Sequence, residues 1–398
     1  MFGGVVVTIS SVVLHYYYVS SESLISEILP EDATLNFVGL ATKYGHPPME
    51  YQIVTEDNYI LTLYRLPGKS PYPILLTHGV LDSSDTFLIR GENSLGITLA
   101  NKGHDVWFGN LRSNRYSRKH VYLDPDKDAE YWDFSFHEVG YYDLPAILDK
   151  VLYETKASNV TAIGHSMGNT IYYVLGSTRS EYNSKINVLL ALSPICFLEN
   201  SIFFSIVLPK TRVFEVLSQR LGIYELFDDH FISTRILKMF CDIPVIGYAL
   251  CAYFFIFPLC GFDDHELEPE FFPIAIEHFL TGTSTKVLLQ YLQNAKHKTF
   301  ARYDYGWKNN FLVYNSLSPP KYDLKKVTMP VALYTARNDF LSSVDDVALL
   351  RKHLPNVVYD IIIPYQMMNH ADFVWGNRTN IYLYPYIFKI LQEFITLH

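Results

Sequence analysis

Short apolar runs alternate with helical patterns along two parts of the chain. Residues 72–77 are almost continuously apolar, which is typical of a strand buried on both faces of a parallel sheet. Residues 59–65 alternate with a period of two and predict a half-buried strand. The same reading predicts strands at 105–108, 160–163, 186–191, 330–335 and 357–363, and helices at 95–102, 143–154, 170–175, 344–353 and 382–397. This alternation predicts a mostly parallel central sheet with helices on both faces.

The alternation stops near Cys196 and resumes near residue 330. Between these points the pattern is helical and strongly apolar. A helical block between two halves of a sheet predicts an inserted cap. We therefore expect two core segments, 22–196 and 309–398, with a helical cap and lid at 197–308.

The first 21 residues carry no Lys, Arg, Asp or Glu and are largely apolar. They are typical of a secretory signal peptide that lacks its basic start, so we expect residues 1–21 to be a signal peptide. An N-terminal anchor is the alternative. In a secreted chain, one disulfide is expected among Cys241, Cys251 and Cys260. Asn377, in the sequon Asn377-Arg378-Thr379, is the candidate glycosylation site.

Charge excludes one class of partner. The net charge is −9 over 398 residues, and no basic cluster or stripe occurs, so nucleic acid is not expected to bind. The cysteine and histidine spacings do not predict a metal site either.

The sequence Gly164-His165-Ser166-Met167-Gly168 lies between a predicted strand and a helical pattern. In that context Gly-x-Ser-x-Gly predicts a nucleophile elbow, which exposes the serine hydroxyl. Ser166 is the candidate nucleophile, and the backbone N–H of Met167 is a candidate oxyanion donor at a helix N-terminus. A glycine-rich turn without chemistry is the alternative.

The loop that follows the strand at 72–77 predicts the second oxyanion donor. It begins His78-Gly79-Val80, and in α/β-hydrolases this loop supplies an N–H, here that of Val80. His78 is an alternative candidate for the catalytic base. We instead expect it to orient its own loop.

A serine nucleophile needs a base and an orienting carboxylate, in the chain order Ser, Asp or Glu, His. Asp339 follows the strand at 330–335, and His370 follows the next strand. Of the histidines after Asp339, His353 lies in a helical pattern and His398 is the last residue. We therefore predict Ser166, Asp339 and His370 as the catalytic triad.

These motifs resemble the acid lipase family, which includes gastric and lysosomal acid lipases. The segments that carry the resemblance are His78-Gly79, Gly164-His165-Ser166, Asn338-Asp339 and Asn369-His370-Ala371-Asp372-Phe373, with residues 45–47, 55–59, 82–84, 105–110, 117–120, 142–146 and 260–263. The resemblance implies an α/β-hydrolase fold with an inserted helical cap and mobile lid, in a secreted or lysosomal glycoprotein that hydrolyses neutral-lipid esters.

The sequence departs from the family pattern at several positions. Met167 stands where the family has Gln, and Val80 where it has Leu, although only the backbone N–H is needed at both. The family disulfide maps to Cys241 and Cys251, with a spacing one residue longer here. The lid sequence is not closely similar, so the resemblance leaves the substrate open.

Residues 243–262 form an uncharged apolar run long enough to span a membrane. A single span there would separate Ser166 from Asp339 and His370, and we expect Gly247 and Pro258 to break the helix. We therefore predict no stable transmembrane span, and instead a lid within about residues 229–260 that binds a lipid interface.

The predicted function is a serine hydrolase that cleaves triacylglycerol or sterol esters through an acyl-enzyme on Ser166. The alternatives are an esterase for smaller soluble esters and a lipid-binding pseudoenzyme. No cofactor is needed for this chemistry. The expected partners are the lipid ester and the lipid–water interface, and a monomer is expected.

Overall fold

The computed structural model describes residues 29–227, 232–243 and 245–396. The predicted signal peptide, residues 1–21, lies outside the described residues, as does part of the predicted lid.

Eight strands form one sheet in the order β1-β2-β4-β3-β5-β6-β9-β10. The strands are β1 (Met49–Val54), β2 (Ile60–Leu66), β3 (Pro73–Thr77), β4 (Asp105–Gly109), β5 (Val160–His165), β6 (Ile186–Leu192), β9 (Val331–Thr335) and β10 (Val357–Ile362). From β4 to β10 all neighbours are parallel, whereas β1 and β2 are antiparallel additions at one edge. The predicted α/β fold with a mostly parallel sheet is confirmed.

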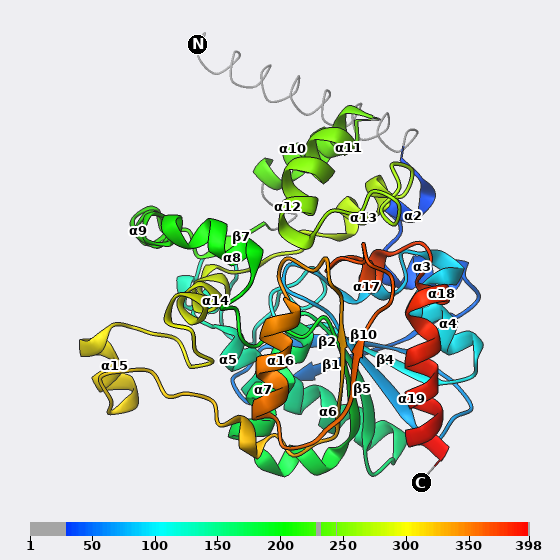
Figure 1. The fold of residues 1–398 in the computed structure, drawn as a ribbon, viewed down its shortest axis with the longest axis horizontal. Coiled ribbons are helices and arrows are strands. Elements are labelled where there is room, and N and C mark those ends of the chain that lie inside the picture. The colour runs from blue at the N-terminus through cyan, green and yellow to red at the C-terminus, as the bar shows by residue number, and fades with distance from the viewer. Residues whose placement is uncertain (1–28, 228–231, 244, 397–398) are drawn as a thin grey trace, which may run out of the picture.

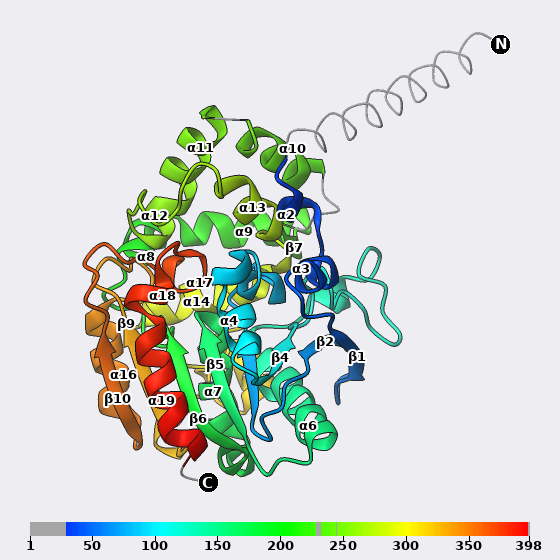
Figure 2. The same cartoon turned by 90° about the vertical axis from the view of Figure 1, so that its right-hand side faces the viewer.

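Helices cover both faces of the sheet because side chains of the buried strands alternate between two apolar clusters. On β3, Ile74 and Leu76 pack with α4 (Leu95–Asn101) and α19 (Tyr384–Thr396), whereas Leu75 packs on the opposite face. That opposite face is covered by helices α6 (Leu144–Thr155), α7 (Met167–Thr178) and α16 (Val344–His353). Figures 1 and 2 show the two helical layers from perpendicular directions.

One strand of the sheet was missed. Strand β1 was not predicted, because its residues are half-buried or exposed and it pairs on one side with β2 alone. The predicted C-terminal helix, residues 382–397, is observed as α19, and a short helix, α18 (Thr379–Tyr382), precedes it.

The chain between β6 and β9 forms a mainly helical layer above the carboxyl ends of the strands (Figure 1). It contains α8 (Ile202–Val207), α9 (Thr211–Leu221), α10 (Ile232–Cys241), α11 (Ile246–Cys251), α12 (Phe257–Cys260), α13 (Phe272–His278) and α14 (Thr285–His297), followed by α15 (Trp307–Tyr314) on a projecting arm. A disulfide joins Cys241 at the end of α10 to Cys251 at the end of α11.

The expectation that Gly247 and Pro258 break the apolar segment is wrong. Residues 246–260 are continuously helical, because a π-helical turn at Ala252–Ile256 lies between α11 and α12. The N–H of Phe257 bonds to Ala252 O in this wider turn, which accommodates Pro258 without a break. The interruption instead lies between Cys241 and Ile246.

No single helix among the described residues is long and apolar enough to cross a membrane. The pair Ile232–Cys241 and Ile246–Cys260 reaches that length only in combination, and the two helices meet at an angle of 114°.

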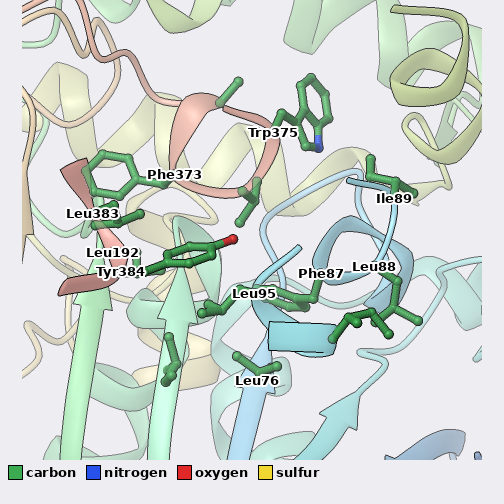
Figure 3. Packing of buried hydrophobic residues seen from close by; sticks show 14 of the residues in the cluster. Leu76, Phe87, Leu88, Ile89, Leu95, Leu192, Phe373, Trp375, Leu383 and Tyr384 are labelled. Atoms are coloured by element: carbon green, nitrogen blue, oxygen red, sulfur yellow. The ribbon is translucent and has the colours of Figure 1, made fainter. Parts of the chain in front are cut away.

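The loop after β3 and the short helix α17 (Asp372–Trp375) pack together over the sheet (Figure 3). Phe87, Leu88 and Trp375 belong to one buried cluster, and the Trp375 indole N–H donates to Thr86 Oγ1 at 2.9 Å. This packing fixes two loops that are far apart in sequence and that both reach the site described below.

A buried ion-pair network connects the end of β4 with the start of α6. The Arg112 guanidinium is fully buried and contacts Asp143 Oδ1 at 2.6 Å and Asp57 Oδ2 at 2.7 Å. Its backbone N–H also donates to Asp143. Burial raises the pKa of Asp143 to about 6, and Arg112 counteracts that shift by stabilising the carboxylate.

Replacing Arg112 by Met keeps most of the volume but leaves the Asp143 carboxylate buried without its cation. We expect the free energy of unfolding near neutral pH to fall by about 3–5 kcal/mol, measured by urea titration. The pKa of Asp143 in the fold already lies above its unfolded value and should rise further in the variant. The buried site favours the neutral Asp143 carboxyl, and the stability that this form confers is lost as the pH rises through the folded pKa. The loss of unfolding free energy caused by Arg112→Met should therefore be smaller at about pH 5 than at about pH 7.5.

The control is Arg179→Met, which removes pairs to the exposed Glu56 and Glu181. That loss should be about 1 kcal/mol or less. Equal losses in the two variants would contradict the assignment of a structural role to the buried network.

Candidate active site

Ser166 lies at a sharp turn between β5 and α7. Its backbone has φ 55° and ψ −119°, in a region that side chains rarely adopt. The two glycines of the motif allow the close packing around it. A Cβ at Gly168 would lie 2.3 Å from the carbonyl oxygen of Thr77, and one at Gly164 would lie 2.4 Å from Asn169 Oδ1. The geometry is that of a nucleophile elbow.

Asp339 and His370 meet at the carboxyl ends of β9 and β10. His370 Nδ1 lies 3.0 Å from Asp339 Oδ2 and 3.1 Å from Oδ1. The backbone N–H groups of Leu341 and Ser342 both donate to Oδ1, at 2.9 and 2.7 Å. The carboxylate is thereby fixed in the turn that follows β9, with its side chain fully buried.

The structure also brings Ser193, which sequence reasoning missed, to this pair. Its hydroxyl lies 2.5 Å from Asp339 Oδ2 and 2.6 Å from His370 Nδ1. Ser193 follows β6 directly, and a polar residue at a strand end next to the elbow strand was the signal that could have identified it.

Ser166 and His370 both line one cavity, but within the described residues Ser166 Oγ makes no hydrogen bond to His370. Such contacts are often long in the absence of substrate and shorten in the reacting complex. The backbone C=O of His370 accepts a hydrogen bond from His165 Nε2 at 3.0 Å, which connects the base to the residue beside Ser166. Burial lowers the pKa of His165 to about 3, so this ring is neutral.

The loop after β3 lies directly against Ser166. A Cβ at Gly79 would be 3.2 Å from Ser166 Cβ, and the N–H of Val80 has no acceptor within the described part of the chain. His78 points away from this chemistry. Its Nδ1 lies 2.8 Å from Gly79 O, and its Nε2 accepts the N–H of Leu111 at 3.2 Å. Burial lowers the pKa of His78 to about 4, consistent with a neutral ring that holds the loop.

The end of α12 is fixed between the loops that carry Asp339 and His370. The carbonyl oxygen of Cys260 accepts the N–H groups of His370, at 3.0 Å, and of Phe340, at 3.3 Å. Gly261 has φ 109°, and a Cβ there would lie 1.8 Å from Asn338 O. Only glycine fits this position, so α12 ends in a backbone contact with the loop that carries Asp339.

The cavity above Ser166 has a volume of about 530 Å³ and an overwhelmingly apolar lining. Core and cap both contribute to the wall, which includes Ile195, Phe203, Phe204, Val207, Phe214, Phe227, Leu237, Phe255, Ile256, Leu259, Ile276, Phe279, Leu288, Leu292, Leu341, Val374 and Trp375. Asp82 is a polar exception, and burial raises the pKa of its carboxyl to about 8. Such a cavity can hold long hydrocarbon chains next to a serine hydroxyl.

The described ranges contain no group of three or more His, Cys, Asp or Glu side chains that could hold a metal ion. Cys196 and Cys260 are buried free thiols, and Asn377 is half-buried in the turn before α18.

Two sequence profiles match the chain. One, described as a partial alpha/beta-hydrolase lipase region, covers residues 37–91, and one described as the alpha/beta hydrolase fold covers residues 72–205. Among solved structures, an esterase from Thermogutta terrifontis aligns with a TM-score of 0.50 and 14% identity, over 87% of this chain and 99% of that one. A structure from Sulfolobus solfataricus aligns with a TM-score of 0.56 and 14% identity, over 84% and 90%. These two show the fold alone.

Relatives of higher identity cover nearly the whole chain. Lipase 1 of Drosophila melanogaster is 35% identical over 92% of this chain and 81% of its own length. Gastric triacylglycerol lipase of Mus musculus is 35% identical, with coverages of 91% and 93%, and that of Homo sapiens is 31% identical, with coverages of 91% and 92%. Together with the elbow, the capped α/β fold and the apolar cavity, this similarity shows that the chain belongs to the acid lipase family of ester hydrolases.

Proposed function

We propose that this protein hydrolyses triacylglycerol or sterol esters through an acyl-enzyme on Ser166. The observation that carries the proposal is the apolar cavity, which reaches both Ser166 and His370. An uncharged ester with long acyl chains matches that lining, whereas a charged substrate would lose its hydration there without gaining polar partners.

In the proposed mechanism, Ser166 Oγ attacks the ester carbonyl carbon while His370 Nε2 accepts the hydroxyl proton. Asp339 holds Nδ1 and stabilises the resulting imidazolium, and the N–H groups of Val80 and Met167 stabilise the oxyanion. His370 then returns the proton to the leaving alcohol oxygen. Water hydrolyses the acyl-enzyme by the same steps.

Several further properties belong to this proposal. Residues 1–21 would be removed as a signal peptide, and the mature monomer would be secreted or lysosomal with a glycan on Asn377. The disulfide between Cys241 and Cys251 supports an oxidising compartment. The names of the gastric relatives support a location outside the cytosol. We also propose that residues 22–196 and 309–398 form the core and that residues 197–308 form the cap.

Ser166→Ala should abolish hydrolysis of an emulsified triacylglycerol, a loss of at least about 10⁴-fold in kcat, because no nucleophile remains. The fold should persist, as judged by circular dichroism. A fluorophosphonate should label the wild type at Ser166 and leave the variant unlabelled. Substantial activity in the variant would exclude the acyl-enzyme, and an unlabelled wild type would favour the lipid-binding pseudoenzyme.

The segment α11–α12 belongs to the proposed lid, about residues 229–260, and it has an outer apolar face as well as a cavity face. Phe254 is 70% exposed and does not line the cavity, whereas Ile256 and Phe257 nearby are buried. Because the outer face can enter lipid, we expect the variant Phe254→Asp to lower activity on emulsified triacylglycerol by about tenfold or more. Hydrolysis of a short soluble ester should be unchanged or faster.

Leu312→Asp is the matched control, since Leu312 is 81% exposed on α15, away from the cap helices (Figure 1). It should leave both activities unchanged. If Phe254→Asp lost both activities while folded, the segment would be packing for the catalytic core rather than a lid. Ordinary saturation with short esters, and no rise in rate above the solubility limit, would favour the soluble esterase.

A further inference from the structure

Ser193 occupies the space between the proposed acid and base. It is fully buried, at the end of β6, and its hydroxyl contacts both Asp339 and His370. The 2.6 Å contact with His370 Nδ1 is shorter than either contact between Nδ1 and the carboxylate, at 3.0 and 3.1 Å.

The hydrogen-bonding roles follow from counting protons. A serine hydroxyl has one proton, and an ionised carboxylate can only accept, so Ser193 O–H is directed at Asp339 Oδ2. The contact with His370 then requires Nδ1 to be the donor and the Ser193 oxygen the acceptor. A proton on Nδ1 leaves Nε2 with a free lone pair, which is the tautomer that a general base needs.

The backbone holds the hydroxyl in this position. Ser193 has φ 48°, an unusual conformation for a residue with a side chain, and its N–H donates to Tyr334 O on β9 at 2.9 Å. The next residue is also fixed, because Ser342 Oγ donates to Pro194 O at 2.7 Å. An unfavourable backbone geometry at a fully buried hydroxyl with two functional contacts indicates a role in the site.

We infer that Ser193 is a positioning residue for the base. Its oxygen accepts the Nδ1–H of His370, and its own O–H donates to Asp339, so that His370 is held in one orientation. The site would then work as Ser166, His370, Ser193 and Asp339, rather than as three residues. This inference rests on the proposed function of Ser166 and His370 and adds a further specific contact to it.

The test uses Ser193→Ala and Ser193→Gly in the full-length protein. A hydrogen bond to a charged group is stronger than one between neutral groups, so its loss should be clearly measurable. We expect kcat for a short soluble ester to fall about 10- to 100-fold in both variants, with KM changed less than about twofold. Glycine adopts φ 48° without strain, so it separates the hydroxyl from the backbone conformation. Ser177→Ala is the control, since it removes another buried serine hydroxyl, bonded at 2.9 Å to Val174 O, and should not change kcat.

A second measurement does not depend on turnover. The proton NMR resonance of His370 Nδ1–H, assigned by its absence in His370→Gln, should move upfield in both Ser193 variants because a short hydrogen bond is lost. An unchanged resonance, an unchanged kcat in both variants, or a loss in Ser193→Ala that Ser193→Gly restores would overturn the inference. If the wild type showed no Ser166-dependent hydrolysis, the proposed function would fail, and the resonance would still decide the role of Ser193.

Discussion

The steric fit of the backbone around Ser166 determines where every other part of the site lies. At Gly168 the start of α7 is so close to β3 that a Cβ would overlap the Thr77 carbonyl, and Gly79 brings the next loop against Ser166. The strained serine conformation is unfavourable by about 1–3 kcal/mol. It persists because β3, β5 and β6 are buried along their whole length, and because Ser166 N–H donates to Leu192 O at 3.2 Å. The sheet therefore holds the elbow, and the elbow places the N–H groups proposed as oxyanion donors.

The second constraint is the contact of the Cys260 carbonyl with the two loops that carry Asp339 and His370. A lid motion that displaced Cys260 would remove hydrogen bonds from the N–H groups of His370 and Phe340. Gly261 leaves no space for adjustment, because its surroundings already exclude a Cβ. Opening without loss of the catalytic geometry therefore requires movement that ends before the last turn of α12. The break between Cys241 and Ile246, where Val245 has φ 65°, is a suitable place for it to begin.

The sequence predicted the parallel sheet well, because a strand such as β3 is buried along its whole length and is apolar except at Thr77. Sequence analysis missed β1, because this strand lies at a solvent-exposed edge of the sheet and has no buried positions to give a clear alternation of apolar and polar residues. Chain order and strand ends were sufficient to propose Asp339 and His370. Ser193 also follows a strand end, but the chain order Ser, Asp, His does not include it, and its contacts depend on the distance between β6 and two loops more than 140 residues away. The expectation that Pro258 breaks the helix was wrong because a π-helical turn leaves no simple signal in hydrophobic spacing.

The apolar residues of α11–α12 do not all face the protein, and this distinguishes the segment from an ordinary amphipathic helix. An ordinary surface helix presents polar residues to water, whereas this one exposes Leu250, Phe254 and Phe255. Its inner side meanwhile supplies Ile256 and Leu259 to the cavity wall. If a lipid phase binds the outer face, the free energy of that contact acts on the same segment that lines the cavity. Adsorption and substrate access would then be coupled through this segment, so the enzyme would expose its cavity where insoluble ester is present and shield it elsewhere.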